Sequence, residues 1–223
     1  MNRTFAHSGK QAISLAALSA ILAVLSFPPC SFSPLAWISL VPWLYSLSQQ
    51  SVKQMLLSHA VFLCLFFGIG LSWMAAVHPL CPIVILFPLY FICLPFPLLF
   101  RWAIVERRLC PFILAPVLWS AGEYLRSFLF SGFPYLFLGH TQAFHPWVIQ
   151  IADITGVYGV TFLIVMVNAL LVVWLRWYLD RSFVPFRRIV GYTGVSALSL
   201  VLVLAYGKDR KSTRLNSSHV SQS

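Results

Sequence analysis

Two oppositely charged side chains, Glu123 and Arg126, lie three residues apart within the apolar segment 119–142. Asp153 is the only other charged side chain in residues 109–175. A spacing of three places Glu123 and Arg126 on one helical face, where opposite charges can pair. Charges within hydrocarbon are costly unless they face a bundle interior or a wet cavity. Two interpretations follow: an internal ion pair that holds neighbouring helices, or a site where Arg126 binds a phosphate-like head group that Glu123 orients.

The composition is that of a membrane protein. Of the 223 residues, 60% are hydrophobic and 9% are charged, and the mean hydropathy is +0.85. Soluble domains carry about 25% charged residues, whereas several apolar runs here approach the roughly 20 residues of a membrane-spanning helix. The sequence therefore predicts an all-α integral membrane protein, in which several helices are short or kinked by proline.

The apolar runs predict about seven transmembrane helices, at 11–27, 34–48, 54–76, 80–100, 112–130, 150–175 and 188–206. These spans make residues 11–206 one polytopic membrane domain, preceded by a cytoplasmic N-terminus at 1–10. The tail at 207–223 is polar and differs abruptly in composition from the rest. We interpret the tail as non-native read-through that replaces the start of a periplasmic domain.

The basic residues predict the orientation of the chain. With a cytoplasmic N-terminus, the cytoplasmic segments hold ten basic residues, the outer loops near 28–34, 76–81 and 131–149 hold none, and Arg126 lies near the outer end of a span. This is the positive-inside pattern, and it places the residues after Tyr206 in the periplasm. The ten are Arg3, Lys10, Lys53, Arg101, Arg107, Arg108, Arg176, Arg181, Arg187 and Arg188.

Several other functions are excluded by the residue pattern. The net charge of +10 comes largely from loop clusters, without the basic stripe of a nucleic-acid-binding surface, so we expect no nucleic-acid partner. The five cysteines and six histidines are scattered singly, without the spacing of a metal site. We expect no metal and no cofactor. Interfacial anchoring is expected of five tryptophans: Trp37, Trp43, Trp73, Trp119 and Trp147.

Three segments together resemble the apolipoprotein N-acyltransferase family. LSFPPCSFSPLAWISLVPWL at 25–44 is similar to that family's proline-punctuated first hairpin. WSAGEYLRSFLFSGFPYLFLGHTQ at 119–142 resembles its E-[WY]-L-R segment, followed by G-F-P-[WY] and L-G-x-x-Q. IQIADITGVYGVTFLIVMVNALL at 149–171 resembles the next signature, in which G-x-Y-G opens a span. The resemblance covers about residues 11–206.

The resemblance implies an enzyme of the bacterial inner membrane that completes lipoprotein maturation. An acyl chain moves from a phospholipid to a cysteine thiol of the enzyme, and then to the α-amino group of a diacylglyceryl-cysteine at a lipoprotein's N-terminus. The expected partners are the phospholipid acyl donor, the diacylated lipoprotein acceptor and membrane lipids. The family's catalytic glutamate, lysine and cysteine belong to a nitrilase-like domain, and they match no residue here. We therefore expect a truncated chain that is inactive alone.

The same motifs imply candidate site residues. Glu123, Arg126, Tyr135, Gln142 and Asp153 are the candidates for binding lipid or substrate, although Asp153 also suits a helix N-terminus whose dipole it would complement. Structural roles are expected for Gly132 and Pro134 in the loop, for Gly156 and Gly159 in close helix approach, and for Asn168 in interhelical hydrogen bonding.

Two other functions stay open from the sequence. In a small membrane transporter, Glu123, Arg126 and Asp153 would line a polar path, but these charges cluster near one membrane face and no inverted repeat is visible. The other alternative is a noncatalytic lipid-binding membrane scaffold.

Overall fold

The computed structural model describes residues 8–105, 107, 109–129, 132–181 and 183–220. Within these residues the chain forms α-helices and short 3-10 helices, and no β-strand, which confirms the predicted all-α class. The elements are α1 (Gly9–Leu25), η1 (Ser33–Trp37), α2 (Val41–Leu47), α3 (Val52–Gly70), η2 (Ser72–Ala76), α4 (Cys81–Cys93), α5 (Pro95–Val105), α6 (Pro111–Arg126), η4 (Leu138–Gln142), α7 (Pro146–Ile149), α8 (Ala152–Leu179) and α9 (Phe186–Val220).

Local sequence explains where many of these helices begin. α1 and α3 each open with a capping box, formed by Ser8 with Gln11 and by Ser51 with Gln54. A capping box satisfies backbone N–H groups that the first turn leaves free. Proline occupies one of the first two positions of α2, α4, α6 and α7, where its missing N–H costs no intrahelical hydrogen bond.

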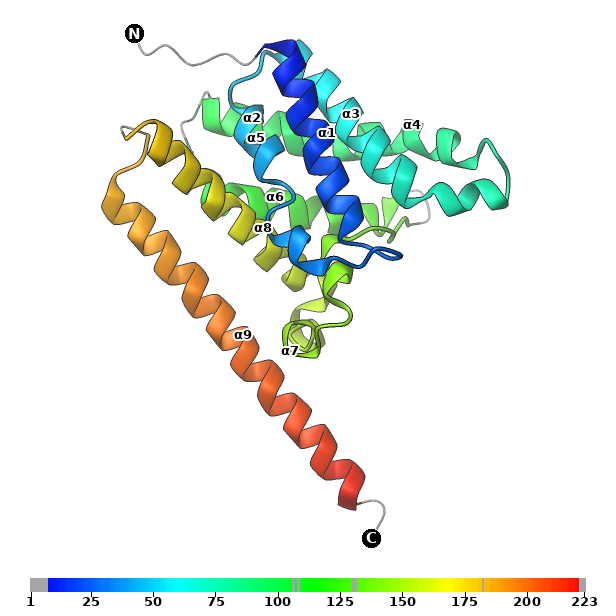
Figure 1. Cartoon of the computed structure of the whole chain (residues 1–223), viewed down its shortest axis with the longest axis vertical. Helices are drawn as coiled ribbons and strands as arrows, with labels where there is room; N and C mark the ends of the chain where they lie inside the picture. Colours follow the sequence, from blue (N-terminus) through cyan, green and yellow to red (C-terminus); the bar gives the residue numbers. More distant parts are fainter. Residues whose placement is uncertain (1–7, 106, 108, 130–131, 182, 221–223) are drawn as a thin grey trace.

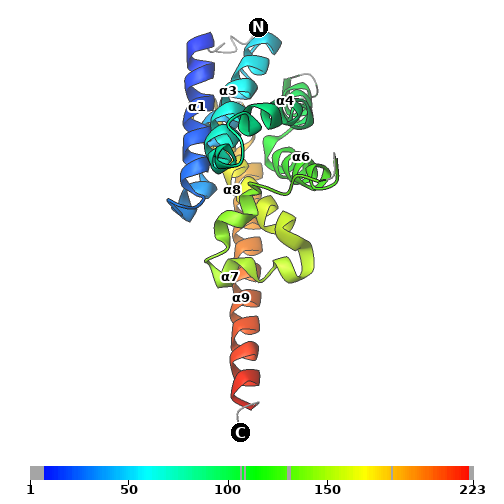
Figure 2. The ribbon, with the colours of Figure 1, turned by 90° about the vertical axis from the view of Figure 1, so that its right-hand side faces the viewer.

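The helices pack around an aromatic core. α1 lies against α2 and α3, and α6 packs along α8 (Figure 1). Trp43, Phe66 and Phe100 are among the largest fully buried side chains. The expectation that Trp43 anchors the chain at a membrane interface is therefore wrong, because only 1% of its surface is exposed. α9 contacts α7 and α8, and it continues beyond the other helices to the C-terminal end (Figure 2).

Four helical segments are long and apolar enough to cross a membrane. They are α3, the pair α4 and α5 (Cys81–Val105), α8, and the part of α9 from Phe186 to Arg210. α1 is apolar but has only 17 residues. Helix length and composition therefore indicate a membrane protein, and they do not confirm the predicted count of seven spans.

Some expected spans differ from the observed helices. The segment 34–48 is not one helix but η1 followed by α2, because Pro34 and Pro42 each lie at the start of a new helix. The segment 80–100 divides between α4 and α5, with Pro95 as the first residue of α5. At the other end of the chain, α9 continues past Tyr206 to Val220, so the change of composition at 207 does not end the helix.

Asn168 of α8 satisfies backbone groups around the break between η1 and α2. Its side-chain oxygen accepts the Leu40 N–H at 2.8 Å. Its side-chain nitrogen donates to the Ala36 carbonyl at 2.9 Å and to the Ile164 carbonyl, in its own helix, at 2.8 Å. Asn168 is fully buried. One side chain thus fastens α8 to the first hairpin of the chain.

We expect Asn168→Leu to lower the free energy of unfolding by about 2–3 kcal/mol, because the Leu40 N–H and the Ala36 carbonyl lose their partner in an apolar interior. Thermal unfolding of the detergent-purified protein measures this loss. Gln49→Leu is the control, because the Gln49 side chain donates to the Tyr45 carbonyl one turn away, at 3.3 Å, and so joins no second element among these contacts. Equal melting temperatures for the two variants would contradict the role of Asn168.

Candidate functional site: a buried carboxylate and guanidinium beside an apolar cavity

Glu123 joins three elements of the fold. It lies in the last turn of α6 with 4% of its surface exposed. Its Oε1 accepts the Trp119 Nε1–H at 3.0 Å and the Leu138 backbone N–H of η4 at 2.9 Å. Its Oε2 accepts the Thr161 hydroxyl of α8 at 2.7 Å, and that hydroxyl in turn accepts the Gly139 N–H at 2.9 Å.

Arg126 is held by the loop that follows α6 and by aromatic rings. The side chain is buried, with 3% exposed. Its Nη1 donates to the Tyr135 carbonyl at 2.7 Å, and its own carbonyl accepts the Phe133 N–H at 2.8 Å. The guanidinium carbon lies 5.0 Å from the ring centre of Phe67 and 4.8 Å from that of Phe137, within the range of cation–π attraction.

The two charges do not pair directly. Among the described residues, the ion pairs within 4.0 Å do not include Glu123 with Arg126. The carboxylate binds groups of η4 and α8, whereas the guanidinium contacts α3 and the loop. The interpretation of the two residues as an internal ion pair is therefore wrong. Each buried charge instead contacts neutral partners.

A cavity of about 150 Å³ lies beside these charges. Its walls come from α2 to α6 and are almost entirely apolar and aromatic. Glu123 and Arg126 are the acidic and basic residues among those that line it. The structure thus brings an apolar chamber and a buried guanidinium together. The sequence motifs do not predict the contributions of α3 and α5 to these walls.

The loop residues around Arg126 have conformational reasons for their identity. Gly132 has φ +87°, and a Cβ there would lie 2.5 Å from the Ser127 carbonyl oxygen, so another residue would be strained. Pro134 and Tyr135 are exposed, and the Tyr135 ring centre lies 5.9 Å from that of Trp73. Neither Pro134 nor Tyr135 lines the cavity.

Gln142 lies away from the cavity, at the junction of η4 with the first hairpin. It is buried, and its amide donates to the Ser33 carbonyl at 3.1 Å and to the Thr141 hydroxyl at 2.9 Å. The Ser33 hydroxyl also contacts His145 Nε2. These contacts join two segments that are more than 100 residues apart in the chain.

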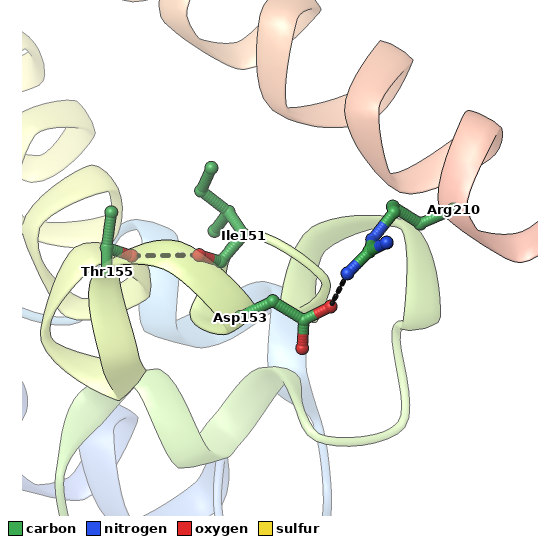
Figure 3. Close-up of polar contacts among 4 residues, drawn as sticks. All are labelled: Ile151, Asp153, Thr155 and Arg210. Carbon is green, nitrogen blue, oxygen red and sulfur yellow. Dashed lines mark hydrogen bonds and ion pairs between the residues drawn. The ribbon is translucent and has the colours of Figure 1, made fainter.

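Asp153 is also remote from the cavity. Its carboxylate pairs with Arg210 Nη2 of α9 at 3.2 Å, and both side chains are partly exposed (Figure 3). Close by, the Thr155 hydroxyl donates to the Ile151 carbonyl at 3.0 Å. Of the five predicted binding residues, the cavity therefore brings together Glu123 and Arg126, while Tyr135, Gln142 and Asp153 lie outside its lining.

The glycines near α8 differ from expectation. Gly156 has φ +65° and interrupts the helical conformation of α8. A Cβ at Gly159 would collide with the Thr155 side chain of the same segment. Close approach between elements is found instead at Gly139, where a Cβ would lie 2.5 Å from the Val157 carbonyl oxygen. The sequence signal for Gly139 was its place in the L-G-x-x-Q motif.

Other chemically active groups are few in this region. Within the described residues, no group of three or more His, Cys, Asp or Glu side chains could hold a metal ion. Cys93 lines the cavity as a free thiol. His140 stacks on Phe137 with ring centres 5.4 Å apart. Partial burial, together with the Arg126 guanidinium, lowers the pKa of His140 and favours its neutral form.

We expect Thr161→Val to lower the free energy of unfolding by about 2–3 kcal/mol, because the Glu123 carboxylate loses a donor and the Gly139 N–H loses its acceptor. Thr193→Val is a matched control, because Thr193 also bridges two groups, Trp174 Nε1 and the Ile189 carbonyl, but on α9. Melting temperatures of both variants in detergent provide the test. A loss no larger than that of the control would disprove the anchoring role of the carboxylate.

Comparisons with known proteins agree with the resemblance seen in the sequence. The family model described as the apolipoprotein N-acyltransferase N-terminal domain matches residues 19–170. An apolipoprotein N-acyltransferase of Geobacter metallireducens is 34% identical over 88% of this chain and 39% of the relative. A protein of the same name from Rhodopirellula baltica is 32% identical over 86% of this chain and 37% of the relative. The chain thus spans less than two fifths of the length of these relatives. With a family match over most of its length, the chain belongs to the apolipoprotein N-acyltransferase family, as a member that carries the N-terminal domain.

Proposed function

We propose that this chain is the membrane part of an apolipoprotein N-acyltransferase of the bacterial inner membrane. In the complete reaction, an acyl chain passes from a phospholipid, through an enzyme thioester, to the N-terminal diacylglyceryl-cysteine of a lipoprotein. The membrane part would bind the phospholipid and present it to the catalytic groups at the outer surface. Family membership over residues 19–170 supports the reaction class, and the cavity supports lipid binding.

The observation that carries the proposal is the Arg126 guanidinium at the edge of an apolar cavity. Among the described residues, the guanidinium donates a single hydrogen bond, to the Tyr135 carbonyl. A guanidinium has five N–H donors in a planar fork that suits phosphate. We assign the phosphate of the donor lipid to Arg126, and its head group to the neighbourhood of the exposed Tyr135.

The other candidate residues have positioning roles in this proposal. Glu123 holds η4 and α8 next to the last turn of α6, so it orients the loop that surrounds Arg126. Gln142 fixes η4 to the first hairpin. Asp153 lies in the first turn of α8, where a carboxylate complements the helix dipole.

We further propose seven membrane crossings, with the N-terminus in the cytoplasm. Contacts between the segments that connect the spans support their division between two sides of the membrane, and the distribution of basic residues supports the orientation. Arg101 donates to the Gln50 carbonyl at 2.8 Å, and Arg176 contacts the Ser48 hydroxyl, so segments assigned to the cytoplasm lie together. The segments assigned to the outside also meet, through Gln142 and Ser33.

Cysteine labelling tests the orientation. On a cysteine-free background, Phe144→Cys should react with an impermeant maleimide in cells whose outer membrane alone is opened. Lys53→Cys should react only after the inner membrane is opened as well. Both positions are exposed, so burial does not explain a difference in labelling. Reaction of Lys53→Cys from outside would disprove this topology.

A chimera tests the function. Residues 1–206 joined to the remaining part of the Geobacter metallireducens relative should restore triacylated lipoproteins in cells depleted of their own enzyme, as measured by mass spectrometry of the lipoprotein N-terminus. Arg126→Gln should lower turnover about ten- to a hundredfold, the value of a charge-assisted hydrogen bond. Arg107→Gln is the control, because Arg107 is exposed at the opposite end of the bundle. A fully active Arg126→Gln chimera would rule out the phosphate contact.

The 223-residue chain by itself should transfer no acyl group to a diacylated lipopeptide. A thioester reaction needs an activated thiol with a base and an oxyanion-binding group, and the family's catalytic residues match none here. Cys93 is the cysteine that shares the cavity with Glu123 and Arg126, so Cys93→Ala is the informative variant. Transfer that disappears in Cys93→Ala would refute this expectation. If the chain in vesicles instead carried a solute across the membrane and transferred no acyl group, the result would favour a transporter.

A further inference from the structure

The lining of the cavity follows one face of α3 and the last turns of α6, and we call this space the slot. α3 lines it with His59, Phe62, Leu63, Phe66 and Phe67, a helical stripe with the spacing of a single face. α6 lines it from Leu118 to Arg126. Each stripe covers eight residue steps, or about 12 Å at the rise of an α-helix. Because Arg126 lies against Phe67, both stripes end at the guanidinium.

The slot opens sideways, between α5 and α6. Leu99 of α5 and Leu125 of α6 line it and are 47% and 57% exposed. Pro95 and Ala121, on the same two helices, line it and are also exposed. In the proposed seven-span topology, this surface of the bundle faces lipid chains. The mouth of the slot is therefore accessible from the bilayer without passage through water.

The deep wall of the slot is closed by aromatic rings. Trp43 stacks on Phe62 with ring centres 4.3 Å apart, and Trp119 meets Phe62 and Phe96 edge-on at 6.1 and 5.0 Å. A cavity of about 150 Å³ takes a guest of about the size of benzene. The slot thus has room for part of one alkyl chain, and not for two chains side by side.

Gly122 leaves the middle of the slot open. It lines the cavity one turn after Leu118 and one turn before Arg126. A Cβ at this position would meet no atom within 4 Å. Glycine inside a helix is about 1 kcal/mol less favourable than alanine, so a helix without a need for this space would be more stable with a side chain here.

We propose that this slot is the binding site for one acyl chain of the donor phospholipid, which enters laterally between α5 and α6, and that Gly122 keeps the site open. The inference rests on the proposed function and names the site of its substrate. The chain lies along α3 and α6 below Arg126, which holds the lipid phosphate at the upper end. Charge complementarity with Arg126 selects a lipid that carries an anionic phosphodiester group over one that has no phosphate, such as diacylglycerol.

Photo-crosslinking in vesicles tests the site directly. The 223-residue chain is placed in phosphatidylethanolamine vesicles that contain a trace of phosphatidylethanolamine with a diazirine near the ester, at mid-chain, or at the methyl end of one acyl chain. Mass spectrometry then maps the labelled residues. We expect the near-ester probe to label Leu125 or Phe67, and the mid-chain probe to label Leu118 or Phe62. Labelling spread evenly over the lipid-facing surface would overturn the proposal.

A neutral probe isolates the role of the phosphate. Diacylglycerol with the same mid-chain diazirine lacks the phosphate and should label the slot about tenfold less, the value of one charge-assisted hydrogen bond. Equal labelling by the two probes would overturn the assignment of a phospholipid as the occupant.

Glycine variants test the space itself. Gly122→Leu should abolish most labelling of Leu118 and Phe62, and Gly122→Ala should reduce it less. Gly68→Leu is the matched control, because Gly68 also lies in a helix with open space at its Cβ but does not line the cavity. Both leucines raise helix propensity, so melting temperatures at or above that of the parent show that the variants fold. Unchanged labelling in a folded Gly122→Leu variant would overturn the proposal.

The proposed function and this site can fail separately. An active chimera with an unlabelled slot overturns the site and leaves the function. A labelled slot in the chain, with an inactive chimera, supports the site and overturns the function.

Discussion

The Glu123 carboxylate imposes the constraint on which this part of the structure depends. A carboxylate inside an apolar bundle is stable only if hydrogen-bond donors surround it. Here the donors come from α6 itself, from the backbone of η4 and from the Thr161 hydroxyl of α8. Because these elements lie up to 38 residues apart in the chain, their relative positions are fixed by one group. The loop that contacts Arg126 connects α6 to η4.

The need for buried polar groups to be hydrogen-bonded also explains the places of Asn168 and Ser19. A membrane-embedded helix that ends early leaves N–H and carbonyl groups without water to bind. At the break between η1 and α2, the Asn168 side chain accepts the Leu40 N–H and donates to the Ala36 carbonyl. At the start of α2, the Trp43 N–H donates to the Ser19 hydroxyl of α1 at 2.9 Å. At these two places, a polar side chain of one helix binds a backbone group at the interruption of another, and the interruption becomes a contact between helices.

Interrupted helices also leave space for the cavity. A bundle of regular helices with matched side chains fills its interior to crystal-like density. In this chain, Pro95 lies at the start of α5, and Gly122 removes a side chain from the facing wall of α6. The slot beside Arg126 is bounded by these two features on one side and by the stacked Trp43 and Phe62 on the other. The guanidinium is thus next to apolar space and not inside a packed ion pair.

The sequence by itself determined the class of the protein, because hydropathy and the scarcity of charge are properties of composition, and it determined the family, because the motifs around Glu123 and Gly132 are contiguous in the chain. It also located the two buried charges. Only the tertiary structure decided what they contact. A spacing of three allows Glu123 and Arg126 to pair. Instead, donors from η4 and α8 bind the carboxylate, and the guanidinium lies against aromatic rings of α3 and the loop.

The slot could not be predicted for a related reason. When nearly every position is apolar, helical periodicity has little contrast, so the faces of α3 and α6 that enclose the cavity are set by packing between helices and not by sequence pattern.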